Sequence, residues 1–241
     1  MAFSHGSKAR LYVGGYDLTG FFKQASMPVE IDTAETTVFN KTSKCFIPGL
    51  MTATLGAEGL FDGGVDAVDQ VITAALQQPS TIVAWLPAGD GFGKVANCMD
   101  AIETKYEPDT SVDDVAQLSL EAQSNVGVER CLVLHDLKAE SANGQGTGLD
   151  NGAATTFGGA GYVIATTPAA NAPVVKIQHS ADNVTYADLL TFNPLAAGRF
   201  QQRQEVAAGV TINRYIRALW TTAGACPPFF VAFWRRPVAI P

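Results

Sequence analysis

The chain has 241 residues, enough for one large domain or two ordinary ones, and 47% of them are apolar. Charged residues make up only 16%, which excludes a disordered or coiled-coil protein. The formal net charge is −7, and carboxylates outnumber cations before residue 133 but not after it. Ordinary duplex DNA binding is therefore disfavoured, because it depends on cationic contacts to phosphate.

No apolar run approaches the length of a membrane-spanning helix, so we expect no membrane insertion. The first fifteen residues contain no apolar signal core, and nothing in them suggests secretion.

Period-2 alternation predicts three half-buried strands, over residues 24–32, 51–59 and 116–123. Pro28 lies inside the first of them and indicates an edge strand or a bulge. Less regular apolar runs predict four further strands in this half of the chain, over 9–13, 82–86, 95–106 and 128–135.

One amphipathic helix is predicted over residues 66–78, because apolar residues from Val68 to Leu76 follow helical spacing. Asp62 or Asp66 can cap its start, and Pro79 ends it. We expect this helix to pack against one side of a sheet.

Residues 139–158 are rich in Gly, Ala, Asn and Thr without apolar periodicity, which predicts a linker. It would separate a first domain, 1–138, from a second domain, 159–241. Short strands with turn signals predict an all-β sandwich for the second domain, Ig-like or jelly-roll-like. These strands are expected over 160–166, 173–179, 186–192, 199–207, 211–221 and 228–235.

The sequence predicts no catalytic, metal or cofactor site. The four cysteines are scattered, the three histidines have no ligand spacing, and no serine sits in a nucleophile elbow. Tyr186, Trp220 and Trp234 are weak candidates for stacking on a sugar ring, and core or rim aromatics are the alternative.

Residues 32–49, DTAETTVFNKTSKCFIPG, form a long polar arm between two predicted strands. Connections of this length without structure of their own are usually functional or disordered.

The arm lies within residues 15–63, which resemble the N-terminal region of major tail tube proteins of long-tailed, non-contractile bacteriophages (siphovirus major tail proteins). The shared features are a D-L-[ST]-G opening, D-T-A-E-x-T, I-P-G-L and E-G-x-F-D-G. Similar stretches follow at residues 106–140, 175–192, 214–220 and 229–236, so the resemblance spans nearly the whole chain.

The resemblance implies a mainly β protein: an N-terminal tail-tube β-sandwich or barrel with one packed helix, followed by the external all-β sandwich. In that family, hexameric rings stack head to tail into a tube that conducts the genome. The implied partners are further copies of the chain, the tape measure protein, the tail terminator and the tail tip proteins. Genomic DNA would pass through without specific binding. The implied location is the virion tail, after synthesis in the host bacterial cytoplasm, and no cofactor is implied.

The resemblance implies that the arm is the element through which rings stack. The residues assigned to this role are Asp32, Thr33, Glu35, Thr36, Thr37, Val38, Phe39, Phe46, Ile47, Pro48 and Gly49. The polar faces of the predicted strands, which carry no Lys or Arg, would line the lumen and repel DNA phosphates. These residues are Glu30, Thr52, Thr54, Glu58, Gln117, Ser119, Glu121 and Gln123.

Three other functions are open alternatives. A carbohydrate-binding or adhesin module would rest on the second domain alone. A tail completion (neck) protein would form a single ring without growing. A hydrolase or metalloenzyme is disfavoured by the missing site residues.

Overall fold

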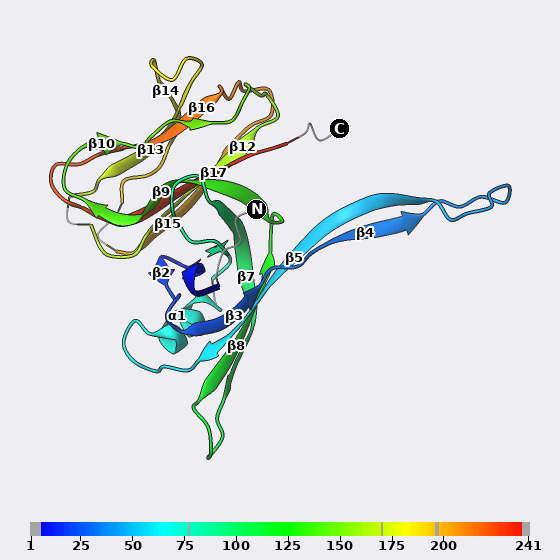
Figure 1. Ribbon diagram of the computed structural model, residues 1–241. Coiled ribbons are helices and arrows are strands. Elements are labelled where there is room, and N and C mark those ends of the chain that lie inside the picture. The colour runs from blue at the N-terminus through cyan, green and yellow to red at the C-terminus, as the bar shows by residue number, and fades with distance from the viewer. Residues whose placement is uncertain (1–5, 77, 170, 196–197, 238–241) are drawn as a thin grey trace. The chain divides into compact units, whose positions relative to one another are not determined.

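The structure is a computed structural model that describes residues 6–76, 78–169, 171–195 and 198–237. Within these residues the chain is mainly β, with two antiparallel sheets and one short α-helix, which confirms the expected fold class (Figure 1). The chain forms two compact units. The first comprises the described residues of Met1–Gly20, Ile82–Cys98 and Glu129–Pro241, and the second comprises Phe21–Thr81 and Met99–Val128.

The first unit contains strands from both sheets. One set runs in the order β15-β12-β17-β9-β7-β6-β1-β2. Its strands are β1 (Arg10–Val13), β2 (Tyr16–Asp17), β6 (Thr81–Leu86), the start of β7 (Val95–Asp109), β9 (Glu129–Glu140), β12 (Gly159–Ala165), β15 (Phe200–Val206) and β17 (Cys226–Arg235). The other set is β10 (Gly144–Gln145), β11 (Leu149–Asp150), β13 (Val174–Ser180), β14 (Ala187–Thr191) and β16 (Tyr215–Thr221). A short 3₁₀ turn, Gly6–Lys8, precedes β1.

Strands β12 and β17 are buried on both faces. Val163 of β12 belongs to a core cluster shared with Ile177 of β13 and Ile216 of β16. Tyr162 and its neighbours on the other face belong to a second cluster that includes Tyr12 of β1. Burial on both faces explains why β12 is apolar throughout and shows no alternation.

The second unit is a sheet centred on β5 (Phe46–Leu60). β5 pairs with β3 (Phe22–Ser26), β4 (Val29–Glu35) and β8 (Gln117–Ser124), and β8 pairs with the remainder of β7. Helix α1 (Val68–Ala75) buries its apolar residues, and the Tyr106 hydroxyl of β7 donates a 2.6 Å hydrogen bond to Asp69 Oδ1.

The helix is shorter than predicted. α1 begins after Ala67, and no side chain caps it, so neither Asp62 nor Asp66 has the expected capping role. The Asp62 carboxylate instead accepts a hydrogen bond from the Gly64 amide, and Asp66 has a positive φ of 60° that places it outside the helix. Gln77, inside the predicted range, lies outside the described residues.

The first predicted strand is divided in two, because β3 ends at Ser26 and β4 starts at Val29, on either side of Met27–Pro28. This agrees with an irregularity at Pro28. The half-buried strand predicted over residues 24–32 would place Val29 and Ile31 on its core face, and this is wrong, because both are about half exposed.

Residues 139–158, the predicted linker, contain β10 and β11, and both strands pair with β16. Thr155 also forms a bridge with Ile212. The division into a tube-building part, 1–138, and an external part, 159–241, stays a prediction. The compact units show which residues pack together, but they do not test which residues take part in assembly.

Within the described residues, no helix is long and apolar enough to cross a membrane.

Candidate functional site

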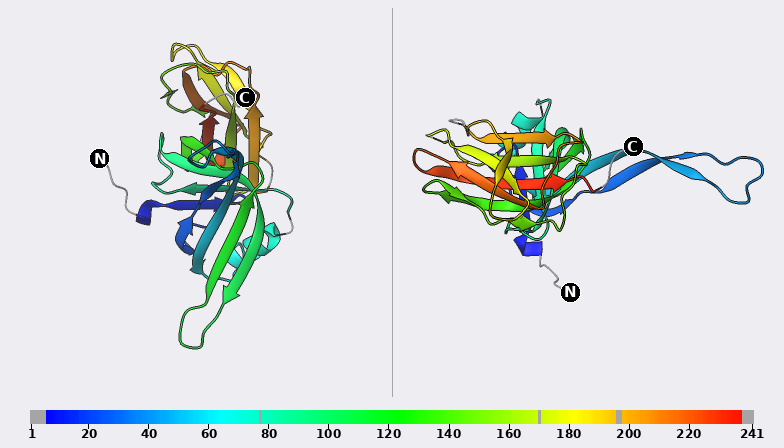
Figure 2. Two further views of the ribbon diagram at one scale, coloured as in Figure 1. Left: turned by 90° about the vertical axis from the view of Figure 1, so that its right-hand side faces the viewer. Right: turned by 90° about the horizontal axis from the view of Figure 1, so that it is seen from above.

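The predicted arm is largely a β-hairpin. β4 and β5 pair from Val29 opposite Ala53 to Glu35 opposite Phe46, and only residues 36–45 remain as a loop. Figure 1 shows this hairpin as a long two-stranded ribbon, and the view from above in Figure 2 shows the same ribbon ending in a free tip. We call residues 29–52 the arm hairpin.

Hydrogen bonds order the tip of the arm hairpin. The Thr36 amide donates to the Cys45 carbonyl at 2.8 Å, and the Cys45 amide donates to Thr37 Oγ1 at 3.0 Å. Lys44 Nζ lies 3.0 Å from Glu35 Oε2, an exposed ion pair of small energetic weight. Threonine side chains thus supply part of the local structure of the loop.

The arm hairpin exposes its apolar side chains. Phe39 at the tip is fully exposed, and Leu50 is 79% exposed. The exposed apolar residues of the hairpin are Val29, Ile31, Val38, Phe39, Phe46, Ile47, Leu50 and Met51. An isolated two-stranded hairpin is at best marginally stable, and contiguous exposed apolar surface marks an interaction site. The hairpin therefore has the properties of an interface element.

The eight predicted lumen residues lie on one face of the second unit's sheet. The register pairs Glu30 with Thr52 and Thr54 with Gln123, and then Glu58 with Ser119. Side chains alternate between the faces of a strand, so Gln117 and Glu121 share this face. The opposite face is buried and includes Leu55, Ala57, Leu118, Leu120 and Ala122.

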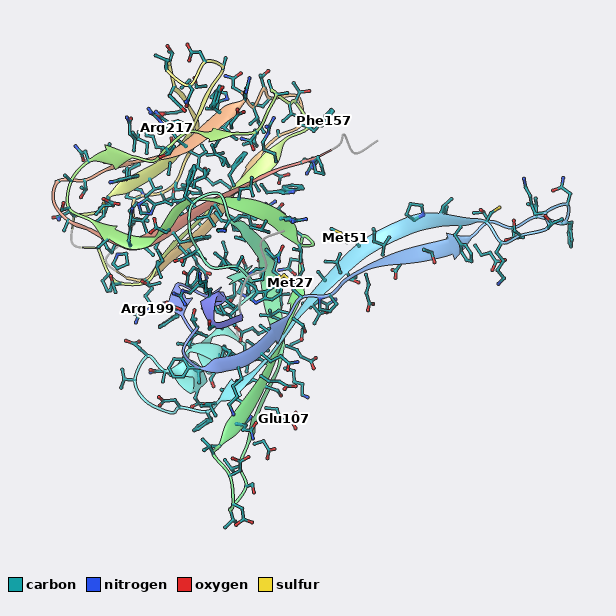
Figure 3. All side chains as sticks on the ribbon, in the orientation of Figure 1. Met27, Met51, Glu107, Phe157, Arg199 and Arg217 are labelled. Atoms are coloured by element: carbon teal, nitrogen blue, oxygen red, sulfur yellow. The ribbon has the colours of Figure 1, made fainter. Side chains whose placement is uncertain are left out.

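The face that carries the eight predicted lumen residues also carries residues that were not predicted from the sequence. β7 places Lys105 opposite Glu121, Glu107 opposite Ser119 and Asp109 opposite Gln117. The register of β7 shifts between Glu103 and Lys105, and this bulge interrupts the alternation that would have shown them. Gln24 and Ser26 of β3 also pair onto this face. We call the whole surface the acidic face, and Figure 3 marks Glu107 on it.

Lys105 is the cation that the sequence analysis did not expect on this face. Its Nζ lies 2.7 Å from Glu107 Oε2, and this hydrogen bond and charge lower the pKa of the Glu107 carboxyl and raise that of Lys105. The acidic face still presents five carboxylates, from Glu30, Glu58, Glu107, Asp109 and Glu121, against this one ammonium group.

The three candidate sugar-stacking aromatics are not brought together. Trp220 on β16 is 6% exposed, donates its indole N–H to the Ala142 carbonyl and packs edge-on against His135 and Phe229. Its ring is covered, so a sugar cannot stack on it. Trp234 lies on β17, in the other sheet, and Tyr186 precedes β14 with the Arg217 guanidinium 3.7 Å from its ring centroid.

Within the described residues, no group of three or more His, Cys, Asp or Glu side chains could hold a metal ion. His135 is buried, with its Nδ1 3.1 Å from the Phe229 carbonyl and its Nε2 3.1 Å from Glu140 Oε1. His179 Nδ1 accepts the Asn213 amide at 3.2 Å. Both histidines therefore support the fold, and His5 lies outside the described residues.

No protein-family model and no curated protein matches the chain. Among solved structures, it is similar to a chain of the virion of a native gene transfer agent particle, with 12% identity and a TM-score of 0.44 over 53% of this chain and 98% of that one. It is similar to the SPP1 tail tube protein, with 14% identity and a TM-score of 0.43 over 53% of this chain and 78% of that one.

The SPP1 Dit protein, of the hub adsorption apparatus in phages that infect Gram-positive bacteria, covers more of the chain. The match has 11% identity and a TM-score of 0.40 over 93% of this chain and 97% of that one. The likeness in each case is one of fold.

Proposed function

We propose that this chain is a structural subunit of a phage tail, whose hexameric rings stack head to tail into a tube that conducts the genome. The observation that carries the proposal is the arm hairpin, which holds eight large apolar side chains exposed in a single copy of the chain. A surface of this kind needs a partner in the working protein, and further copies supply it in a self-assembling tube.

Stacking of identical rings explains why the arm hairpin is long and protruding. A head-to-tail contact is heterologous, so each copy offers one surface and receives a different one, and growth does not close. The residues assigned to stacking are those predicted from the sequence, from Asp32 to Gly49. Burial of Phe39, Phe46 and Ile47 against the next ring would supply the hydrophobic part of the contact.

The acidic face suits the lumen of such a tube. Five carboxylates against one ammonium give it negative charge, which repels DNA phosphates and lets a genome slide without sticking. The proposal keeps DNA as cargo that is not specifically bound, and the tape measure, terminator and tip proteins as partners. Residues 1–138 would build the tube, and residues 159–241 would form an external domain. The role is not enzymatic.

The proposal is tested by sedimentation velocity over a concentration series. Replacing residues 36–45 with Asn-Gly closes the hairpin with a two-residue turn, because Glu35 and Phe46 are already paired. We expect the wild-type chain to form large assemblies and this variant to remain a folded subunit.

A single-residue pair provides the control. Phe39→Ser removes an apolar side chain from the arm tip, and Val184→Ser removes a comparably exposed one from the loop before β14. Assembly should be impaired only by the first. Normal assembly of the shortened hairpin would refute the stacking role.

A further inference from the structure

A cleft of about 360 Å³ lies in the first unit, beside the end of β17. Its walls include three arginines, Arg130, Arg235 and Arg236, together with Leu132, Asn151 and Thr155. The proposed tail function uses none of these residues. Three of them carry guanidinium groups in a chain whose formal net charge is −7.

The three arginines have unused hydrogen-bonding capacity. Arg235 Nη2 donates to the Ala153 carbonyl at 2.7 Å, but its Nε is buried and has no partner among the described residues. The same holds for the Nε of Arg236. The Arg130 side chain is exposed on β9, and no hydrogen bond or ion pair joins it to another described side chain. Buried donors normally find an acceptor, so these atoms indicate that one is missing.

Protein carboxylates neutralise only part of this charge. Arg236 Nη2 pairs with Glu205 Oε1 at 3.4 Å, and Glu205 also lies 3.6 Å from Arg203 Nη1. Among the described residues, no carboxylate forms an ion pair with Arg130 or Arg235. Burial lowers the pKa of Arg235, which reflects the cost of holding a cation there.

The strand register also places like charges near one another. Phe233 of β17 pairs with Leu132 of β9. Because these strands are antiparallel, continuing the register by two positions brings Arg235, two residues after Phe233, opposite Arg130, two residues before Leu132, on the same face. Like charges facing each other across antiparallel strands are destabilising unless something neutralises them. An anion seated between the two guanidinium groups would do so.

We propose that this cleft binds the phosphate group of a small phosphorylated sugar or polyol. The guanidinium fork matches phosphate oxygens and can donate two parallel hydrogen bonds. The cleft falls within the size range of small-molecule sites, so there is room for a carbon skeleton beside the phosphate. Asn151 Nδ2 already donates to the Leu149 and Arg214 carbonyls, which leaves Asn151 Oδ1 to accept from a hydroxyl group, and Thr155 Oγ1 can still donate to one. Leu132 and Phe233 form an apolar wall.

Isothermal titration calorimetry on the full chain tests the assignment, with glucose 6-phosphate, inorganic phosphate and glucose as probes at constant ionic strength. We expect glucose 6-phosphate to bind more tightly than inorganic phosphate, and glucose without phosphate not to bind. Arg130→Gln should weaken binding of glucose 6-phosphate by about tenfold, the usual effect of losing one charge-assisted contact.

The Arg130 side chain is exposed and has no hydrogen bond or ion pair with another described side chain, so the variant should fold, and its melting temperature checks this. Lys138→Gln removes the same charge from the same strand outside the cleft and should bind like the wild type. Binding of glucose 6-phosphate unchanged in Arg130→Gln, or no stronger than that of glucose, would overturn the proposal. Equal affinities for glucose 6-phosphate and inorganic phosphate would overturn its sugar or polyol part.

Discussion

Replacing Glu103 with Gln should remove a pH-dependent loss of stability from the second unit. Glu103 lies on β7 opposite Ala122, on the buried face of the sheet, and is 4% exposed. Neither carboxylate oxygen has a hydrogen-bond partner in the part of the chain that the structure describes. Burial without compensation raises the pKa of this carboxyl from 4.5 to about 8. At neutral pH the side chain is therefore protonated in the folded chain and ionised in the unfolded chain.

The sign and size of the effect follow from that difference. Because the folded state holds the proton more tightly, stability is fully present below pH 4.5 and falls as the pH rises toward 8. One pKa unit corresponds to about 1.4 kcal/mol, so the loss at pH 7 is about 3 kcal/mol. Glutamine has nearly the same shape and does not titrate, so Glu103→Gln should not show this loss.

The assay is amide hydrogen exchange of β8 at pH 5 and pH 7, corrected for intrinsic exchange rates. Tryptophan fluorescence is unsuitable because Trp85, Trp220 and Trp234 all belong to the first unit. Between these pH values, protection of β8 in the wild type should fall by roughly a hundredfold more than in Glu103→Gln. Glu121→Gln, on the exposed face of the same sheet, is the control. Identical pH dependence in wild type and Glu103→Gln would show that burial of Glu103 is not costly.

Three further predictions concern the acidic face and the two cores. Lysines at both Glu58 and Glu121 should leave tubes that form but eject DNA poorly, and unimpaired ejection through such tubes would show that this face does not line the lumen. Arg203→Leu leaves the buried Glu129 carboxylate without its 2.5 Å partner and should destabilise the first unit by about 3 to 5 kcal/mol in urea unfolding followed by tryptophan fluorescence. Arg214→Leu breaks an exposed pair with Asp150 and should leave the urea midpoint close to that of the wild type. Gly59→Ala places a Cβ against the Phe21 carbonyl oxygen, closer than van der Waals contact allows, and should destabilise the second unit by about 1 to 3 kcal/mol in hydrogen exchange. Gly56→Ala meets only ordinary contact and should exchange like the wild type.

Alternation along a strand was enough to predict which side chains share a face. Thr54, Glu58 and Glu121 were assigned together from the sequence, and the β5–β8 register places them together. Alternation failed at β12, which is buried on both faces, and at the bulge after Glu103, where the period is broken. It also misassigned Val29 and Ile31, because an apolar face on a protruding hairpin has the same pattern as a core strand.

Which distant strands pair could not be predicted from local patterns. β1, β6 and β9 lie in the same compact unit as the C-terminal strands, although the sequence grouped them with residues 21–81. Pairings such as β9 with β17 join residues about a hundred positions apart, and periodicity carries no information about them. The arginine cleft was missed for the same reason, because Arg130 and Arg235 become neighbours only through that pairing.

Negative-stain electron microscopy of the purified protein over a concentration series tests most directly whether this chain builds a tube from copies of itself. We expect long, uniform, hollow tubes that lengthen with concentration. Monomers at every concentration, or single rings that never stack, would contradict it.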